Sequence, residues 1–225
     1  MQRITINRRQ PIMTYILTAI NVVVFLFDTV SQWIWGYPIL TLYGAKVNVA
    51  ILFGQYWRLI TPIFLHSGVE HILFNSLALI IWGRQVETLL GKWKYLAVYL
   101  MAGFMGSCMS FAFSPNASVG ASGAIFGLFG ALLYFGREHK EIFNRIFGVQ
   151  LLIIIGVNLA MGFMQPNIDN FGHIGGPIGG YLACGITGFY GAAGNRGLRW
   201  LFLAGYIAAA AILLTLGVLL RKGGY

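Results

Sequence analysis

The chain has 225 residues, of which 58% are apolar and only 9% are charged. A soluble globular domain carries about 25% charged residues, so this composition excludes a water-soluble surface. The formal net charge of +9 does not indicate a nucleic-acid-binding protein, because the basic residues stand between long uncharged stretches. The composition predicts a polytopic membrane protein whose surroundings are the lipid bilayer, with no nucleic-acid partner.

Stretches without Asp, Glu, Lys or Arg indicate the membrane spans. A helix needs about 20 residues to cross the hydrocarbon core, so the uncharged run 95–136 is long enough for two spans. The turn-rich segment 114–118 separates them. Because every backbone polar group in lipid must be paired internally, we expect an all-α fold. The predicted helices, in chain order, are 12–29, 70–90, 94–113, 121–136, 147–164, 168–190 and 199–220.

The positions of Lys and Arg predict the orientation in the cell membrane. With the N-terminus in the cytoplasm, eleven of the 15 basic residues lie inside, and the outer loops 114–120 and 165–169 contain none. Four basic residues lie outside, namely Lys46, Arg58, Arg221 and Lys222. The last two oppose the positive-inside rule at the seventh span. The first span could instead be a signal-peptide core, but no small-x-small cleavage site follows it before Asp28, which favours an uncleaved helix.

The segment between the first two spans is aromatic rather than hydrophilic. Six Trp and Tyr residues lie from Trp33 to Trp57, which is typical of the headgroup zone, so this segment is expected in the membrane interface. The two cysteines, Cys108 and Cys184, fall within predicted spans. Neither has the flanking residues of a metal site, and we interpret both as small packing residues.

Polar side chains inside the spans are costly and therefore indicate function. Ser122 lies at the start of the fourth predicted span and His173 about five residues into the sixth, and both spans begin on the outer side. At 1.5 Å per residue, His173 lies roughly 7 Å below the start of its helix. His71 and Asn75 occupy the first turns of the second span, again from outside. These four residues therefore share one shallow depth.

Ser122 and His173 have the chemistry of a nucleophile and a general base. Ser122 stands between glycines at a helix start, where backbone N–H groups are unpaired. The hydrolase G-x-S-x-G pattern is absent, because position 124 is Ala124. Small residues spaced by four around His173 let another helix approach closely. If that helix carries Ser122, the imidazole can take its proton. Each residue singly also suits a packing or hydrogen-bonding role.

In their order along the chain, these residues resemble the rhomboid family of intramembrane serine proteases. The resemblance runs from about residue 50 to 185 and rests on Trp57-Arg58, 71–75, Gly83-x3-Glu87-x3-Gly91, Gly120-Ala121-Ser122-Gly123 and 169–176. It implies a single membrane domain, 1–225. A rhomboid-like six-helix core at 12–190 would follow a short cytoplasmic N-terminus at 1–11, and one further transmembrane helix would follow at 199–220.

The resemblance also implies roles for individual residues. Ser122 would be the nucleophile and His173 its general base, with no acid required. Asn75, His71 and the backbone N–H of Ser122 would form the oxyanion hole, a set of donors each worth on the order of 3 kcal/mol. Gly120 would leave room for the substrate backbone. No metal and no cofactor is expected.

Four further positions deserve comparison with the family pattern. Phe126 stands where a tyrosine often follows the serine by four residues, and one helical turn keeps its ring near His173. Glu87 is expected to tie helices together, with Arg84 or a polar group on the cytoplasmic side as its partner. Asp169 is expected to cap the sixth span. His66 is expected to make structural hydrogen bonds.

The resemblance implies a serine endopeptidase that hydrolyses peptide bonds in or near transmembrane segments of other membrane proteins, with an active site that opens to the outer side. A metalloprotease is disfavoured because H-E-x-x-H is absent and H-x-x-E-H would need histidine where Ser67 stands. An aspartyl protease is disfavoured because Asp28 and Asp169 lie at span ends. A transporter is disfavoured because the sequence contains no internal repeat. The open alternative is a non-proteolytic rhomboid-like binder or escort of membrane proteins.

Overall fold

In the computed structural model, residues 10–165, 168–190 and 196–222 are described, and their regular elements are helical apart from one isolated bridge between Lys46 and Ser118. The protein is therefore an all-α polytopic membrane protein. The main helices are α1 (Ile12–Trp35), α4 (Val69–Ala78), α5 (Arg84–Leu90), α6 (Lys92–Phe113), α7 (Ser122–Glu138), α8 (Lys140–Ile146), α9 (Gly148–Phe163), α10 (Asn170–Thr187) and α11 (Arg196–Lys222). Shorter elements are α2 (Ile39–Gly44), α3 (Asn48–Leu52), η1 (Tyr56–Leu59), η2 (Thr61–Phe64) and the π-helical η3 (Leu79–Gly83).

Each predicted span corresponds to a helix in the structure. The first runs beyond its predicted end to Trp35, where Gly36 adopts the left-handed conformation that ends many helices. The second consists of α4 and α5 joined through the π-helical η3. Helix α8 was not predicted, and a bend of 67° separates it from α9. The predicted N-terminal segment 1–11 lies outside the described residues except for its last two positions.

Within the described residues, three helices are long and apolar enough to span a membrane, namely α1, α6 and the Arg196–Arg221 part of α11, and the bent α8–α9 pair would be a fourth. The other predicted spans are shorter or rich in glycine. Helix α7 is buried over most of its length by other helices, so its surface does not need to suit lipid. By contrast, the exposed side chains of α1, α9 and α11 are mostly apolar, as contact with lipid requires.

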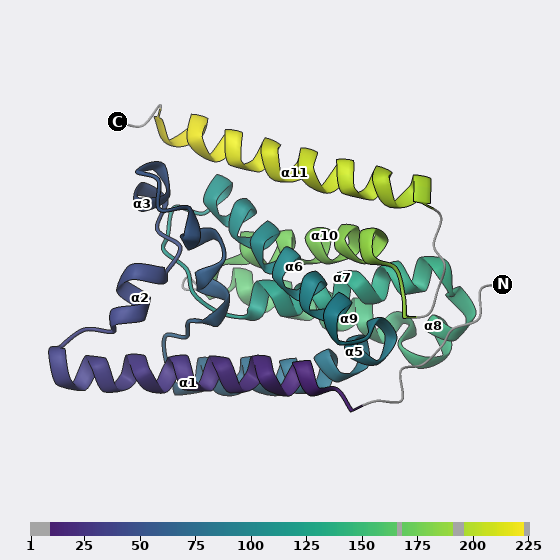
Figure 1. The fold of residues 1–225 in the computed structure, drawn as a ribbon, viewed down its shortest axis with the longest axis horizontal. Helices are drawn as coiled ribbons and strands as arrows, with labels where there is room; N and C mark the ends of the chain where they lie inside the picture. The colour runs from purple at the N-terminus through teal and green to yellow at the C-terminus, as the bar shows by residue number, and fades with distance from the viewer. Residues whose placement is uncertain (1–9, 166–167, 191–195, 223–225) are drawn as a thin grey trace.

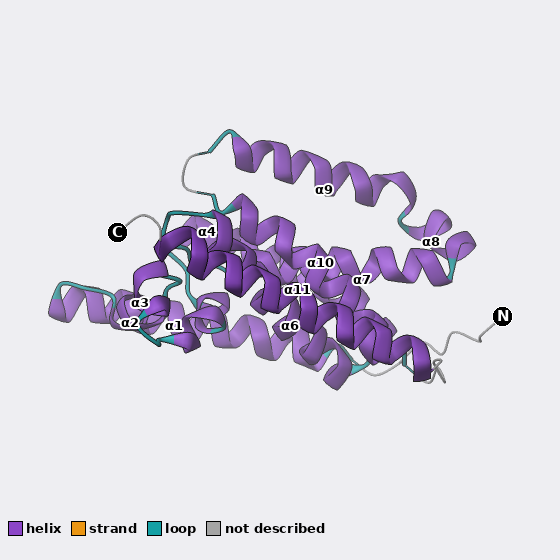
Figure 2. Ribbon diagram, turned by 90° about the horizontal axis from the view of Figure 1, so that it is seen from above, coloured by secondary structure: helices purple, strands orange, loops and turns teal. Residues whose placement is uncertain are grey.

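Helix α10 lies at the centre of the bundle. Figure 1 shows α1 and α11 on opposite sides, with α6, α7 and α10 between them. Seen from above, α9 runs along the outside and is connected to α7 through α8 (Figure 2). The short helices α2 and α3 lie at the same end of the bundle, with α3 beside the C-terminal end of α11 and α2 closer to α1 (Figure 1).

Glycines bring α10 into backbone contact with its neighbours. A Cβ atom on Gly176 would collide with the carbonyl oxygen of Gly123, and one on Gly180 with that of Gly127. On the other side of α10, a Cβ on Gly175 would lie 2.8 Å from a carbonyl oxygen of α6. The small residues spaced by four therefore pack α10 against two helices at once, one of them the helix that begins at the serine.

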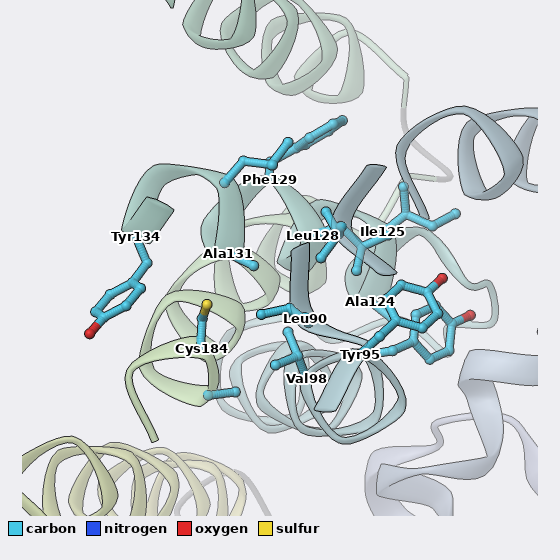
Figure 3. Packing of buried hydrophobic residues seen from close by; sticks show 14 of the residues in the cluster. Leu90, Tyr95, Val98, Ala124, Ile125, Leu128, Phe129, Ala131, Tyr134 and Cys184 are labelled. Atoms are coloured by element: carbon cyan, nitrogen blue, oxygen red, sulfur yellow. The ribbon is translucent and has the colours of Figure 1, made fainter. Parts of the chain in front are cut away.

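The apolar core fills the space between these helices. Figure 3 shows Leu90, Val98 and Leu128 packed together from three different helices, and all three are buried. Cys184 points into the same core, and like Cys108 it is buried and unpaired. Both thiols therefore pack as small apolar groups, which agrees with the prediction from the sequence.

A buried carboxylate holds the start of α1. Glu87 accepts hydrogen bonds from the backbone N–H groups of Met13 (2.9 Å) and Thr14 (2.7 Å) and from the Thr14 hydroxyl (2.8 Å). The first N–H groups of a helix lack partners and carry partial positive charge, so an anion is stabilised there. The sequence predicted either Arg84 or a polar group on the cytoplasmic side as the partner of Glu87. The partner is the polar start of α1, and the prediction of Arg84 is wrong.

Two basic residues on the predicted outer side bind the C-terminal end of α6 and the residues that follow it. The Lys46 amine donates to the carbonyl oxygens of Asn116 (2.7 Å) and Ser114 (3.3 Å). The Arg221 guanidinium donates to the carbonyl oxygens of Ser114 (2.7 Å) and Phe111 (2.9 Å). The last carbonyls of a helix lack partners and carry partial negative charge. These two cations are therefore part of the fold and are a weak guide to orientation.

Helix α2 is held in a similar way at both ends. Asp28 accepts hydrogen bonds from the N–H groups of Leu40 (2.7 Å) and Thr41 (2.9 Å) at its start. Arg58 donates to the carbonyl oxygen of Ala45 (2.7 Å) at its end. The aromatic segment after the first span is thus tied to the bundle by buried charges.

The glycine contact predicts a strong effect of one methyl group. We expect Gly180→Ala to destabilise the protein by about 1–3 kcal/mol, because the new Cβ must displace the backbone of α7. Gly156→Ala is the matched control, since a Cβ at that position in α9 meets no atom within 4 Å. Thermal unfolding in detergent measures both. Equal midpoints for the two variants would contradict the packing described above.

Lys46 predicts a pH dependence of stability. Burial lowers the pKa of Lys46 from 10.5 to about 8. Between these values the unfolded chain binds more protons than the folded chain, so the free energy of unfolding rises with pH across this window. We expect the thermal midpoint of the wild type to rise relative to that of Lys46→Met between pH 8 and pH 10. Parallel curves for the two proteins would show that another group is responsible.

Candidate active site

A glycine turn leads directly into the helix that presents Ser122. Gly120 has a φ of 132°, a conformation that favours glycine, and its N–H donates to the carbonyl oxygen of Pro62 (2.9 Å). Helix α7 begins two residues later at Ser122. The N–H groups of Ser122 and the next residues therefore have no acceptor within the helix. The serine hydroxyl and free backbone donors lie together at this helix start.

His173 contacts Ser122 directly. The Nε2 atom of His173 lies 2.7 Å from the Oγ atom of Ser122. When Nε2 carries no proton, the hydroxyl donates this hydrogen bond, which is the arrangement of a nucleophile and its general base. The contact joins α7 to α10 across 51 residues of sequence. We call these two residues the Ser122–His173 pair.

The imidazole is also held on its face. Phe126 lies one helical turn after Ser122 on α7 and stacks on His173, with ring centroids 4.5 Å apart and an angle of 10° between the planes. The stack restricts rotation of the imidazole, and the hydrogen bond to Ser122 fixes its edge. The ring orientation therefore depends on two contacts from the same helix.

His71 borders the same space from α4. A Cβ atom on Gly120 would lie 2.8 Å from His71 Nε2 and 3.6 Å from Ser122 Oγ, so glycine leaves a gap between these two polar atoms. On the other side of the ring, His71 Nδ1 lies 3.1 Å from the Ser67 hydroxyl. If that hydroxyl donates, Nε2 carries the proton and points toward the gap.

Asn75 lies one turn further along α4. Its side chain is mostly buried, and one amide proton is donated to the carbonyl oxygen of His71 at 2.9 Å. This hydrogen bond fixes the amide against its own helix. The structure thus brings Ser122, His173, Phe126, Gly120 and His71 together, whereas Asn75 is connected to the group through His71.

His66 differs from its predicted role. Neither ring nitrogen makes a hydrogen bond of good geometry within the described residues, although the backbone of Phe64 lies nearby. The ring instead packs edge-on against His71, with centroids 5.1 Å apart. Burial, together with the proximity of His71, lowers the pKa of His66 to about 4. His66 is therefore neutral at physiological pH and adds no charge beside His71.

A cavity of about 40 Å³ adjoins the Ser122–His173 pair, between α6, α7 and α10. Polar side chains in its lining come from Ser107, Ser118, Ser122, Asp169 and His173. A cavity needs at least ~10–15 Å³ and polar partners to hold a water molecule, and this one meets both conditions. Among the described residues, no three His, Cys, Asp or Glu side chains come together as a metal site requires.

Asp169 has the predicted capping role and a second contact that the sequence did not reveal. Its side chain accepts the N–H of Gly172 at the start of α10 (3.1 Å), as the sequence predicted. It also accepts a hydrogen bond from the hydroxyl of Ser110 on α6. Ser110 was missed, and the only signal was that it is one of two serines within the predicted span 94–113.

Comparison with known proteins agrees with the resemblance. A family model described as the Rhomboid domain matches residues 53–190. The chain is 44% identical over 189 residues to the rhomboid protease GluP of Bacillus subtilis (strain 168). The aligned residues make up 83% of this chain and 37% of GluP. It is 35% identical over 183 residues to YdcA of the same organism, covering 79% of this chain and 89% of YdcA.

A plant relative, RHOMBOID-like protein 9, chloroplastic, of Arabidopsis thaliana, is 35% identical over 178 residues, covering 74% of this chain and 40% of that protein. The chain thus spans most of YdcA but less than half the length of GluP and of the plant protein.

The geometry predicts that Ser122 is unusually reactive for a serine. We expect a fluorophosphonate probe to label Ser122, and His173→Ala to reduce labelling by on the order of a hundredfold or more, because the general base is removed. His139→Ala is the matched control, since His139 packs against Phe135 and Phe189 far along α7. Mass spectrometry identifies the labelled residue. Labelling that survives in His173→Ala would show that the 2.7 Å contact does not activate the hydroxyl.

Proposed function

We propose that this chain, which belongs to the rhomboid family, is an intramembrane serine protease that hydrolyses peptide bonds in or near the transmembrane segments of other membrane proteins. The observation that supports this most is the 2.7 Å contact between Ser122 Oγ and His173 Nε2 inside an apolar helical bundle. The name of GluP as a rhomboid protease supports the same reaction. The proposed reaction uses a neutral hydroxyl and a neutral imidazole, and neutral groups cost less free energy to bury within a membrane than charged ones.

In the first step, Ser122 Oγ attacks the carbonyl carbon of the scissile peptide bond as its proton passes to His173 Nε2. Negative charge then develops on the carbonyl oxygen. The backbone N–H of Ser122 and the Nε2–H of His71 border the gap at Gly120, and we assign them as donors to this oxygen. Asn75 would join them by rotating its amide from the His71 carbonyl.

In the second step, the protonated His173 gives its proton to the leaving amine, and an acyl-enzyme remains on Ser122. A water molecule then attacks the acyl carbon while the imidazole takes one of its protons, the bond from that carbon to Ser122 Oγ breaks, His173 returns the proton to Oγ, and the product leaves as a carboxylic acid. The polar cavity beside the Ser122–His173 pair is suited to supply that water. Its position matters because the apolar residues around the bundle would otherwise keep water away.

The substrate must lose helical structure near the cut. A regular helix hides its carbonyl groups in hydrogen bonds, so small or helix-breaking residues at the cleavage site would help. We propose that the N-terminus lies in the cytoplasm and that the site opens to the outer side of the cell membrane. In this orientation the basic residues that do not cap helices lie mainly on the cytoplasmic side, as the positive-inside rule requires.

The alternative is a non-proteolytic binder or escort of membrane proteins that keeps the rhomboid fold. A binder has no need for a hydroxyl within hydrogen-bond distance of an imidazole, and both groups are present. A folded wild-type protein that neither cleaves substrates nor reacts with the fluorophosphonate probe would favour this alternative.

Substitution of either residue of the Ser122–His173 pair tests the proposal. We expect Ser122→Ala and His173→Ala to abolish cleavage of a model transmembrane substrate in detergent or liposomes, while thermal unfolding shows that both variants remain folded. A zinc chelator should leave the wild-type rate unchanged, because Ser122 and His173 carry out every proposed step. Cleavage that persists in Ser122→Ala would sink the serine mechanism.

A further inference from the structure

Asp169 connects three parts of the molecule close to the Ser122–His173 pair. Its carboxylate accepts the N–H of Gly172, which caps α10, and the hydroxyl of Ser110 from α6. The Ser110 hydroxyl is fully buried and also lies 3.4 Å from the hydroxyl of Ser118 in the segment that leads to α7. One carboxylate thus links the start of α10, the end of α6 and the approach to the serine.

The imidazole of His173 has one side without a hydrogen-bond partner. Its Nε2 atom contacts Ser122 and its face contacts Phe126, but Nδ1 is buried and finds no partner among the described residues. When the ring takes the proton of the serine it becomes a cation in an apolar bundle. Such a cation is costly unless an anion lies nearby.

The charged groups around His173 can be identified element by element. Asp169 precedes it by four residues, about one turn, and both side chains line the 40 Å³ cavity. His71 is the other titratable group that acts on the ring, and it comes from α4. Lys46 of the first loop interacts electrostatically with Asp169 and also with Arg221 of α11. Asp169 is therefore the only anion among these groups.

We propose that Asp169 is a positioning residue for the Ser122–His173 pair, which fixes the start of α10 through Ser110 and supplies the negative charge that stabilises the protonated His173. The inference rests on the proposed function. Asp169 takes no proton in this scheme, because the proton moves from Ser122 Oγ to His173 Nε2 and from there to the leaving amine.

Asp169→Asn separates the charge from the cap. Asparagine caps helices about as well as aspartate, so the link to Gly172 is kept while the negative charge is lost. We expect kcat to fall about tenfold with KM unchanged, and the acid limb of the kcat–pH profile to move about one unit to lower pH. The limb moves in this direction because an imidazolium without its anion loses its proton more readily.

Two matched controls accompany this variant. Asp28→Asn alters a carboxylate that caps α2 in the same manner, and it should leave the pH profile in place. Ser110→Ala keeps the carboxylate and removes one of its anchors, so it should lower the thermal midpoint without moving the acid limb. If Asp169→Asn does not fold, Asp169→Glu and Asp169→Gln provide a pair of equal length that differs only in charge, and the limb of the Gln variant should lie at lower pH.

The possible results separate this inference from the proposed function. A wild type that cleaves substrate, with an Asp169→Asn profile identical to it, would overturn the inference and leave the protease proposal standing, since Asp169 would then be a cap only. A wild type that neither cleaves nor reacts with the fluorophosphonate probe would overturn both.

Discussion

Backbone contact between α7 and α10 determines where the Ser122–His173 pair lies. Gly123 and Gly127 on α7 meet Gly176 and Gly180 on α10, so that the helix backbones touch. The serine is the first residue of one helix and the histidine lies in the first turns of the other, close to the contact. Because proton transfer needs a hydrogen bond of normal length, the chemistry that we propose depends directly on how near these helices come.

Several charges in the described part of the chain bind the ends of helices. Glu87 binds the start of α1, Asp28 the start of α2, and Lys46 and Arg221 the end of α6. In a membrane protein an unpaired backbone group has no water to bind, so a buried charge at a helix end satisfies several groups at once. Of the basic residues on the predicted outer side, Lys46 and Arg221 therefore have a structural role.

The small number of charged groups in the bundle also matters for the reaction that we propose. A pair of neutral groups can be kept in an apolar bundle without large cost, but the reaction that we propose passes through an imidazolium and an oxyanion. His71, free backbone N–H groups and Asp169 surround that position, and each is held by its own contacts with Ser67, the glycine turn or Ser110. The groups that we propose to meet developing charge are thus held in place by contacts already present in this structure.

The sequence alone determined the helical architecture, because uncharged runs in a membrane protein must form internally paired helices. It also placed Ser122 and His173 near the starts of their helices, where the structure has them. It could not determine which side chains meet across helices. The partner of Glu87, the aromatic packing of His66, the amide of Asn75 turned to its own helix, and the link from Ser110 to Asp169 all depend on helix rotation and on contacts between distant segments. These were decided only by tertiary packing, in which glycines set how closely the helices approach.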